Sequence, residues 1–166
     1  TLARIAHARV TLVHLGLAAR DLANAPRGFG FLVPPDAGSS APRMLGTIFG
    51  SNIFAGRAPA EHHAVTSFYA SADLPRGTEH ELASFAARDL ATALGLARAP
   101  EPVCARVIQW DGVIPRYASG HRDRMTYVER ALATHAPGLV LAGSYTGGVS
   151  VEQVITRGRT VARALL

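Results

Sequence analysis

The chain has 166 residues, of which 48% are hydrophobic and 17% charged, so it is long enough for one ordinary domain with a buried core. Its 17 basic residues are all arginines and give a net charge of +5, but they are spread from Arg4 to Arg163 rather than gathered in a nucleic-acid-binding tail. The single cysteine, Cys104, excludes an intrachain disulfide and a multi-cysteine metal site. No stretch approaches the roughly twenty apolar residues of a transmembrane helix. We therefore expect a cytoplasmic protein, soluble or attached peripherally to a membrane, that binds no nucleic acid.

Four segments of the first seventy residues predict strands. Each combines β-branched and apolar side chains and is bounded by glycine, proline or a turn: 9–17, 28–33, 43–49 and 64–70. A connector rich in Gly, Ser and Pro at 36–42 predicts a turn between the second and the third. The first three of these strands therefore indicate an antiparallel meander.

The pattern becomes helical at Glu79. Thr78 is a candidate N-cap and Gly95 a candidate end. The apolar residues between them recur at intervals of three or four: Leu82, Phe85, Ala86, Leu90 and Leu94. A strand is expected at 103–110 and a second helix at 122–135.

The last thirty residues predict a strand at 138–142, a glycine-rich turn from Gly143 to Ser150, and a final helix. Gly147 and Gly148 remove side chains just before this helix, whose first turn offers unpaired N–H groups and the positive end of the helix dipole. The turn therefore predicts a site for an anionic or electron-rich cofactor edge. The alternative is a helix capped by its own Ser150, with no ligand.

Several short motifs follow one another along the chain. They are Gly-Phe-Gly-Phe-Leu-Val-Pro at 28–34, Leu-Gly-Thr-Ile-Phe at 45–49, Ile-Phe-Ala-Gly-Arg-Ala-Pro at 53–59, Trp-Asp-Gly-Val-Ile-Pro-Arg-Tyr at 110–117 and Gly-Ser-Tyr-Thr-Gly-Gly-Val-Ser-Val at 143–151. In this order they resemble the protoporphyrinogen oxidase branch of the flavin-containing amine oxidoreductases. Two departures are that Arg116 stands where relatives carry Gln and Ser144 where they often carry Asn or Asp. A Ser hydroxyl at that position can still donate or accept a hydrogen bond.

The resemblance implies an α+β fold that covers the C-terminal third of a full enzyme. Residues 1–109 would form part of the substrate-binding domain, with an antiparallel or mixed sheet and helices, and residues 110–166 the C-terminal strand and helix of a Rossmann-like FAD-binding domain. The chain contains no Rossmann G-x-G-x-x-G turn. We therefore expect a fragment or processed product, with an upstream half that supplies most of the FAD contacts.

The resemblance also implies an activity: a heme-biosynthesis oxidase that passes hydride equivalents from protoporphyrinogen IX or coproporphyrinogen III to FAD, with oxygen as the final acceptor. No catalytic side chain and no metal is expected. The substrate residues implied are Leu32, Phe54 and Tyr117. The cofactor-binding residues implied are Trp110, Ile114, Pro115, Gly143, Ser144, Gly147, Gly148, Val149, Ser150 and Val151. For Trp110, Leu32 and Phe54 the alternative is an ordinary core position.

Two other function classes stay open. One is a flavin-free binding or assembly module of the same fold, which the missing Rossmann turn favours. The other is a different flavin amine oxidoreductase, such as an amine oxidase or carotenoid desaturase, against which the motif at 28–34 argues. The identity of the porphyrinogen, formation of a homodimer and contact with a membrane stay open as well.

Overall fold

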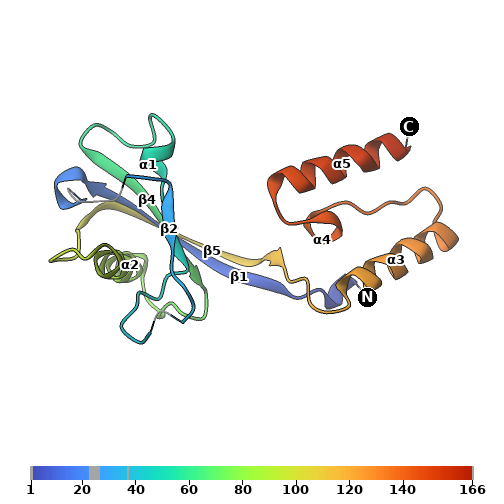
Figure 1. Cartoon of the computed structure of the whole chain (residues 1–166), viewed down its shortest axis with the longest axis horizontal. Coiled ribbons are helices and arrows are strands. Elements are labelled where there is room, and N and C mark those ends of the chain that lie inside the picture. The colour runs from blue at the N-terminus through green and yellow to red at the C-terminus, as the bar shows by residue number, and fades with distance from the viewer. Residues whose placement is uncertain (1, 23–26, 37, 166) are drawn as a thin grey trace. The chain divides into compact units, whose positions relative to one another are not determined.

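The computed structural model describes residues 2–22, 27–36 and 38–165 (Figure 1). It divides into two compact units, residues 9–110 and residues 1–8 with 111–166, which we call the sheet unit and the C-terminal unit. Strands β1 (His7–Ala18) and β5 (Pro102–Pro115) run across the division between them. The assignment of residues 1–109 to substrate binding and of 110–166 to FAD binding stays a prediction.

The sheet unit is built on one five-stranded sheet in the order β2-β3-β4-β1-β5. Its remaining strands are β2 (Gly30–Leu32), β3 (Gly46–Phe49) and β4 (His62–Ala70). The pairs β2–β3, β3–β4 and β4–β1 are antiparallel, which confirms the predicted antiparallel pairing. The predicted meander is wrong at its first strand, because β1 lies between β4 and β5 and not beside β2. Strands β2 and β3 are shorter than predicted. One further backbone bond lies on each side of the paired residues, from the Phe49 N–H to the Phe29 carbonyl and from the Val33 N–H to the Leu45 carbonyl, and Pro34 and Pro35 lack the donors needed to continue beyond Val33.

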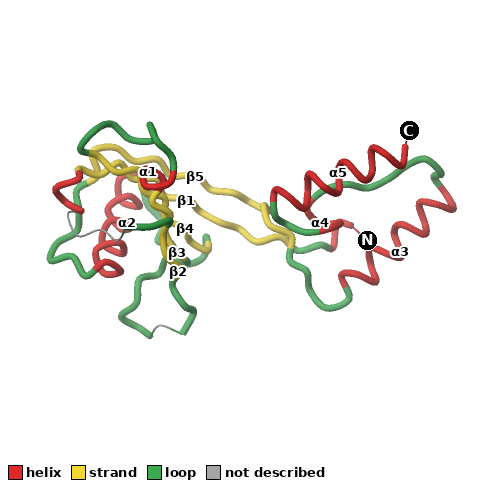
Figure 2. Tube along the Cα trace, turned by 45° about the horizontal axis from the view of Figure 1, so that its top comes forward, coloured by secondary structure: helices red, strands yellow, loops and turns green. Residues whose placement is uncertain are grey.

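One face of this sheet forms the core. Successive side chains of a strand point to opposite faces, and Val13, Leu15, Val65 and Tyr69 are all buried on the same face. Helix α2 (Glu79–Leu94) covers that face, as Figures 1 and 2 show, and adds its own buried side chains to the core cluster: Ala83, Ala86, Ala87 and Leu90. The small alanines let the helix backbone approach the sheet closely.

Helix α2 confirms the prediction made for it at both ends. Thr78 and Glu81 form a reciprocal capping box, in which the Thr78 hydroxyl accepts from the Glu81 N–H and the Glu81 carboxylate accepts from the Thr78 N–H. Gly95 ends the helix in the left-handed conformation, with φ of 64°. Short helical segments precede α2 in the described residues: η1 (Leu2–Arg4), η2 (Ala19–Leu22) and α1 (Gly50–Ile53).

The C-terminal unit contains the helices α3 (His121–His135), α4 (Ser144–Gly147) and α5 (Val151–Leu165). Helix α3 confirms the prediction of a helix at 122–135, and α5 confirms the final helix. The prediction of a buried strand at 138–142 is wrong: these residues form no strand, and Leu139 is 57% exposed. A strand exists only where a neighbour takes up its backbone hydrogen bonds, and the one sheet of the described chain consists of β1 to β5. Among the described residues, no helix combines the length and apolar character that a bilayer crossing requires.

Candidate functional site

The glycine-rich turn between residues 143 and 151 is built around the single helical turn α4. Gly143 and Gly148 flank α4 with φ values of 138° and 128°, a region that favours glycine. The Thr146 side chain closes the segment locally, since its Oγ1 donates to the Gly143 carbonyl at 2.8 Å. The turn therefore depends on its glycines for its path.

Ser150 caps the final helix. Its Oγ accepts from the Gln153 N–H at 3.2 Å, and its own N–H donates to Gln153 Oε1 at 3.2 Å. The structure thus places Ser150 in the helix cap that the sequence left open as the alternative to a ligand contact. A Cβ added at Gly148 would lie 2.3 Å from Gln153 Oε1, so the glycine makes room for this cap.

The hydrogen bonds of the turn leave a small set of donors for a ligand. The Gly148 N–H donates to the Tyr117 hydroxyl at 2.9 Å, while the Ser150 and Gln153 N–H groups serve the cap. Helix α5 makes its first backbone bond from the Val154 N–H to the Ser150 carbonyl. In the part of the chain that the structure describes, the N–H groups of Val149, Val151 and Glu152 therefore have no acceptor.

Two aromatic side chains contact this turn, Tyr117 from the segment before α3 and His121 from the first position of α3. The Tyr117 hydroxyl donates to the Ser144 carbonyl, and the Tyr117 ring stacks on His121 with centroids 4.3 Å apart. His121, 8% exposed, donates from Nε2 to the Tyr145 carbonyl at 2.8 Å. Tyr117, His121, Gly148 and Gln153 contribute to the lining of a hollow of about 600 Å³ within the C-terminal unit.

A half-buried arginine connects the helices of the same unit. Arg157 on α5 donates from Nη2 to Glu129 Oε1 on α3 at 2.9 Å and to the Leu141 carbonyl at 3.2 Å. Its side chain also passes within 3.7 Å of the position that a Cβ on Gly147 would occupy. A lone arginine in a helix carries no sequence signal for this role, because its partners lie on other elements.

The other expected cofactor residues lie on β5. Ile114 is exposed and Pro115 buried, both in the C-terminal unit, whereas Trp110 belongs to the sheet unit. Trp110 is 49% exposed, so the structure does not place it in the core. Their contact with a flavin stays a prediction.

Leu32 lies on the face of the sheet opposite to α2. It is 86% exposed and pairs across the strands with Gly46, which pairs with Phe68, which in turn pairs with Leu12. A Cβ on Gly46 would lie 2.5 Å from the Phe31 carbonyl oxygen and 3.0 Å from the Leu32 side chain. Because no side chain rises between Leu32 and Phe68, this row is flat and apolar. We call this row, together with the neighbouring row described in the next paragraph, the glycine-floored face.

The neighbouring row runs from Gly30 through Ile48 and Thr66 to His14. The His14 Nδ1 and the Thr66 hydroxyl share a hydrogen bond of 2.9 Å, and burial lowers the pKa of His14. Sequence reasoning missed Leu12, His14 and Phe68 as members of this face. Alternation along the predicted strands could have identified their side of each strand, but only the register shows that they meet.

Phe54 is the third expected substrate residue. It follows α1 in the sheet unit, is exposed, and carries the Arg57 guanidinium 5.3 Å above its ring. The structure thus does not bury Phe54 in the core.

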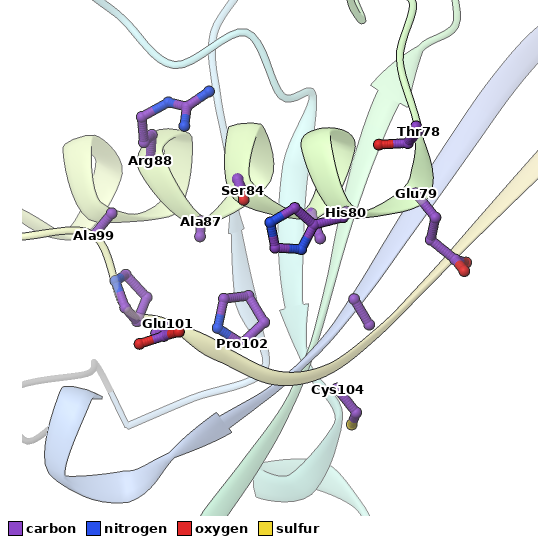
Figure 3. A pocket seen from close by; sticks show the side chains of 13 residues that line it. Thr78, Glu79, His80, Ser84, Ala87, Arg88, Ala99, Glu101, Pro102 and Cys104 are labelled. Atoms are coloured by element: carbon purple, nitrogen blue, oxygen red, sulfur yellow. The ribbon is translucent and has the colours of Figure 1, made fainter.

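A hollow of about 810 Å³ in the sheet unit lies between α2 and β5, and none of the expected site residues lines it. His80 and Pro102 face one another across it in Figure 3. Glu79 at one end accepts from the Val107 N–H at 2.7 Å and so covers part of the edge strand. Within residues 2–22, 27–36 and 38–165, no group of three His, Cys, Asp or Glu side chains is arranged to hold a metal ion.

The comparisons with known proteins agree with the resemblance noted in the sequence. The family model described as flavin containing amine oxidoreductase matches residues 9–166. Protoporphyrinogen oxidase 2 of Arabidopsis thaliana is 31% identical over 134 residues, which cover 79% of this chain and 26% of that protein. Coproporphyrinogen III oxidase of Mycobacterium bovis is 35% identical over 85 residues, 51% of this chain and 18% of that protein.

A solved structure shows the same fold. It is a protein from Exiguobacterium assigned as a protoporphyrinogen oxidase, which superposes on 99% of this chain and 36% of its own with a TM-score of 0.77 at 20% identity. The chain thus spans about a quarter of the length of the Arabidopsis relative. The Arabidopsis relative and the Exiguobacterium structure each match most of this chain to one part of a longer protein.

Proposed function

Because this chain belongs to the flavin containing amine oxidoreductase family, we propose that it forms the C-terminal part of an FAD-dependent oxidase that converts protoporphyrinogen IX or coproporphyrinogen III into the porphyrin. Relatives named protoporphyrinogen oxidase and coproporphyrinogen III oxidase support this substrate class. The observation in this chain that carries the proposal is the glycine-floored face of the sheet.

A tetrapyrrole is a broad macrocycle and suits a wide, shallow, apolar wall. Glycine is required at two positions of this face, since a Cβ on Gly30 would lie 2.0 Å from the Thr47 carbonyl oxygen and one on Gly46 would meet the Phe31 carbonyl oxygen. Leu32 and Phe68 stand on either side of Gly46 and provide apolar contact. Apolar walls with a few polar groups are typical of ligand sites, and His14 with Thr66 would supply the polar groups here.

The turn and the start of α5 fit the electron-rich edge of a flavin. The unpaired N–H groups of Val149, Val151 and Glu152 lie at the positive end of the α5 dipole. The Glu152 carboxylate in the same first turn would repel a phosphate, so a flavin carbonyl suits these donors better than the pyrophosphate does. When bound, the flavin supplies the redox chemistry, while the residues of this chain bind and orient.

Purification of the full-length gene product tests the proposal. We expect flavin absorbance to survive desalting, and porphyrin fluorescence to develop, with oxygen uptake, from one of the two porphyrinogens. Leu32→Glu should keep the flavin and raise the KM for the porphyrinogen, because a carboxylate then stands on the apolar row.

Each alternative predicts a different result in the same experiment. A protein that retains no flavin in its full-length form would be a binding or assembly module, and the enzyme proposal would fail. A flavoprotein that oxidises an amine and neither porphyrinogen would be a different member of the family. If Leu32→Glu leaves the KM for the porphyrinogen unchanged, the glycine-floored face is not part of the substrate site.

A further inference from the structure

The Tyr117 hydroxyl is hydrogen-bonded to two points of the expected cofactor turn. The Tyr117 hydroxyl donates to the carbonyl of Ser144, the first residue of α4, and accepts at 2.9 Å from the N–H of Gly148, the residue after α4. Helix α4 has four residues and no side-chain cap, and a single helical turn is not stable by itself. The Tyr117 oxygen therefore joins the two ends of a segment that its own hydrogen bonds stabilise only weakly.

A buried imidazole supports this phenol. His121 lies against Tyr117 with the ring planes 11° apart, and its Nε2 is bonded to the Tyr145 carbonyl at 2.8 Å. Because a carbonyl oxygen only accepts, Nε2 carries the hydrogen. The Nδ1 atom is buried and has no hydrogen-bond partner among the described residues. One orientation of the ring thus satisfies Tyr145 and provides the surface on which Tyr117 stacks.

We propose that Tyr117 and His121 form a clasp that fixes the turn 143–149 in its ligand-binding conformation before the flavin arrives. The clasp binds the turn at Ser144, Tyr145 and Gly148, directly before the unpaired donors that begin at Val149. This inference rests on the proposed flavin site. It makes Tyr117 a positioning residue that acts through the turn, instead of the substrate contact that the resemblance implies.

The geometry favours the positioning role because the only hydrogen of the Tyr117 hydroxyl is already donated within the protein. Its one hydrogen goes to Ser144, and one lone pair receives the Gly148 N–H. A substrate group that accepted a hydrogen bond from this hydroxyl would have to displace the Ser144 carbonyl. A preformed turn lowers the ordering cost of ligand binding, which is the benefit that the clasp provides.

The test compares Tyr117→Phe with Tyr127→Phe in the full-length gene product. Both variants lose one phenol oxygen, but Tyr127 lies on α3, is 66% exposed and makes none of the contacts of the clasp. In the flavin-free Tyr117→Phe protein, we expect the backbone amides of residues 144–149 to exchange their hydrogens with solvent faster than in the wild type. We also expect FAD to bind about tenfold more weakly, since a lost hydrogen bond is worth roughly that factor. His121→Leu should behave like Tyr117→Phe, and His121→Gln, which keeps a side-chain N–H donor, should recover part of the loss.

The outcomes separate the clasp from its alternatives. Equal amide exchange and equal FAD affinity in Tyr117→Phe and Tyr127→Phe would overturn the clasp. The clasp would also be overturned if Tyr117→Phe raised the KM for the porphyrinogen at saturating FAD and left FAD affinity and amide exchange unchanged. Tyr117 would then be a substrate contact. A wild-type protein that retains no flavin would overturn the proposed function, and the exchange comparison would still decide whether the clasp holds the turn.

Discussion

The capping box of α2 allows a stability prediction of defined size. The Thr78 hydroxyl accepts from the Glu81 N–H, one of the donors that a helix start leaves without a backbone partner. Thr78→Ala removes this acceptor and should destabilise the sheet unit by about 1 kcal/mol, within the range of roughly 0.5–2 measured for such caps. For a unit of this size, 1 kcal/mol corresponds to a fall in Tm of about 4–8 °C, measurable by circular dichroism or calorimetry.

Thr92→Ala is the matched control for this prediction. Thr92 lies in the last turn of the same helix, and its hydroxyl donates to the Arg88 carbonyl at 3.1 Å. That carbonyl belongs to the helix interior, so the substitution removes no cap and should change stability by less than about 0.5 kcal/mol, helped by the higher helix propensity of alanine. Equal losses in the two variants would refute the capping argument.

The same capping box has a pH dependence. Hydrogen bonds from the Thr78 N–H and hydroxyl lower the pKa of Glu81. A carboxyl with a depressed folded-state pKa stabilises the fold above its unfolded pKa, and this contribution is lost as the pH falls through the folded pKa. Urea titrations should therefore show that Thr78→Ala costs less in acid than at neutral pH. A pH-independent cost would contradict the role of the ionised Glu81.

Three further predictions concern the core and the turn. Leu90→Ala opens a cavity beneath α2, where Leu90 is fully buried, and should cost about 2–5 kcal/mol in urea unfolding. Burial raises the pKa of Asp89, so the folded state binds the proton more tightly and stability should fall as the pH rises through that pKa; Asp89→Asn should abolish this slope in urea titrations while still accepting from the Arg43 N–H. Gly148→Ala forces a Cβ within 2.3 Å of Gln153 Oε1 at a φ of 128°, so we expect a loss of about 1–3 kcal/mol and of flavin retention, and unchanged unfolding would argue against the described turn.

Helix α2 shows what the sequence determines by itself. Its start, its apolar stripe and its end at Gly95 follow from residues within a few positions of one another, and the structure confirms each. The strand expected at 138–142 shows the opposite case, because an apolar run becomes a strand only beside a partner that its own residues do not specify. Local signals therefore sufficed for α2 and failed for this strand.

The candidate site depends on both levels. The amino-acid sequence by itself identified the glycine-rich turn and the helix that follows it, since glycine preferences are local to the backbone. Only the tertiary structure decided that Leu32, Phe68 and Leu12 form one row, because strand register joins residues far apart in the chain. It likewise decided that the Tyr117 hydroxyl meets the Gly148 N–H, 31 residues further along, since such a bond depends on how the chain returns to itself.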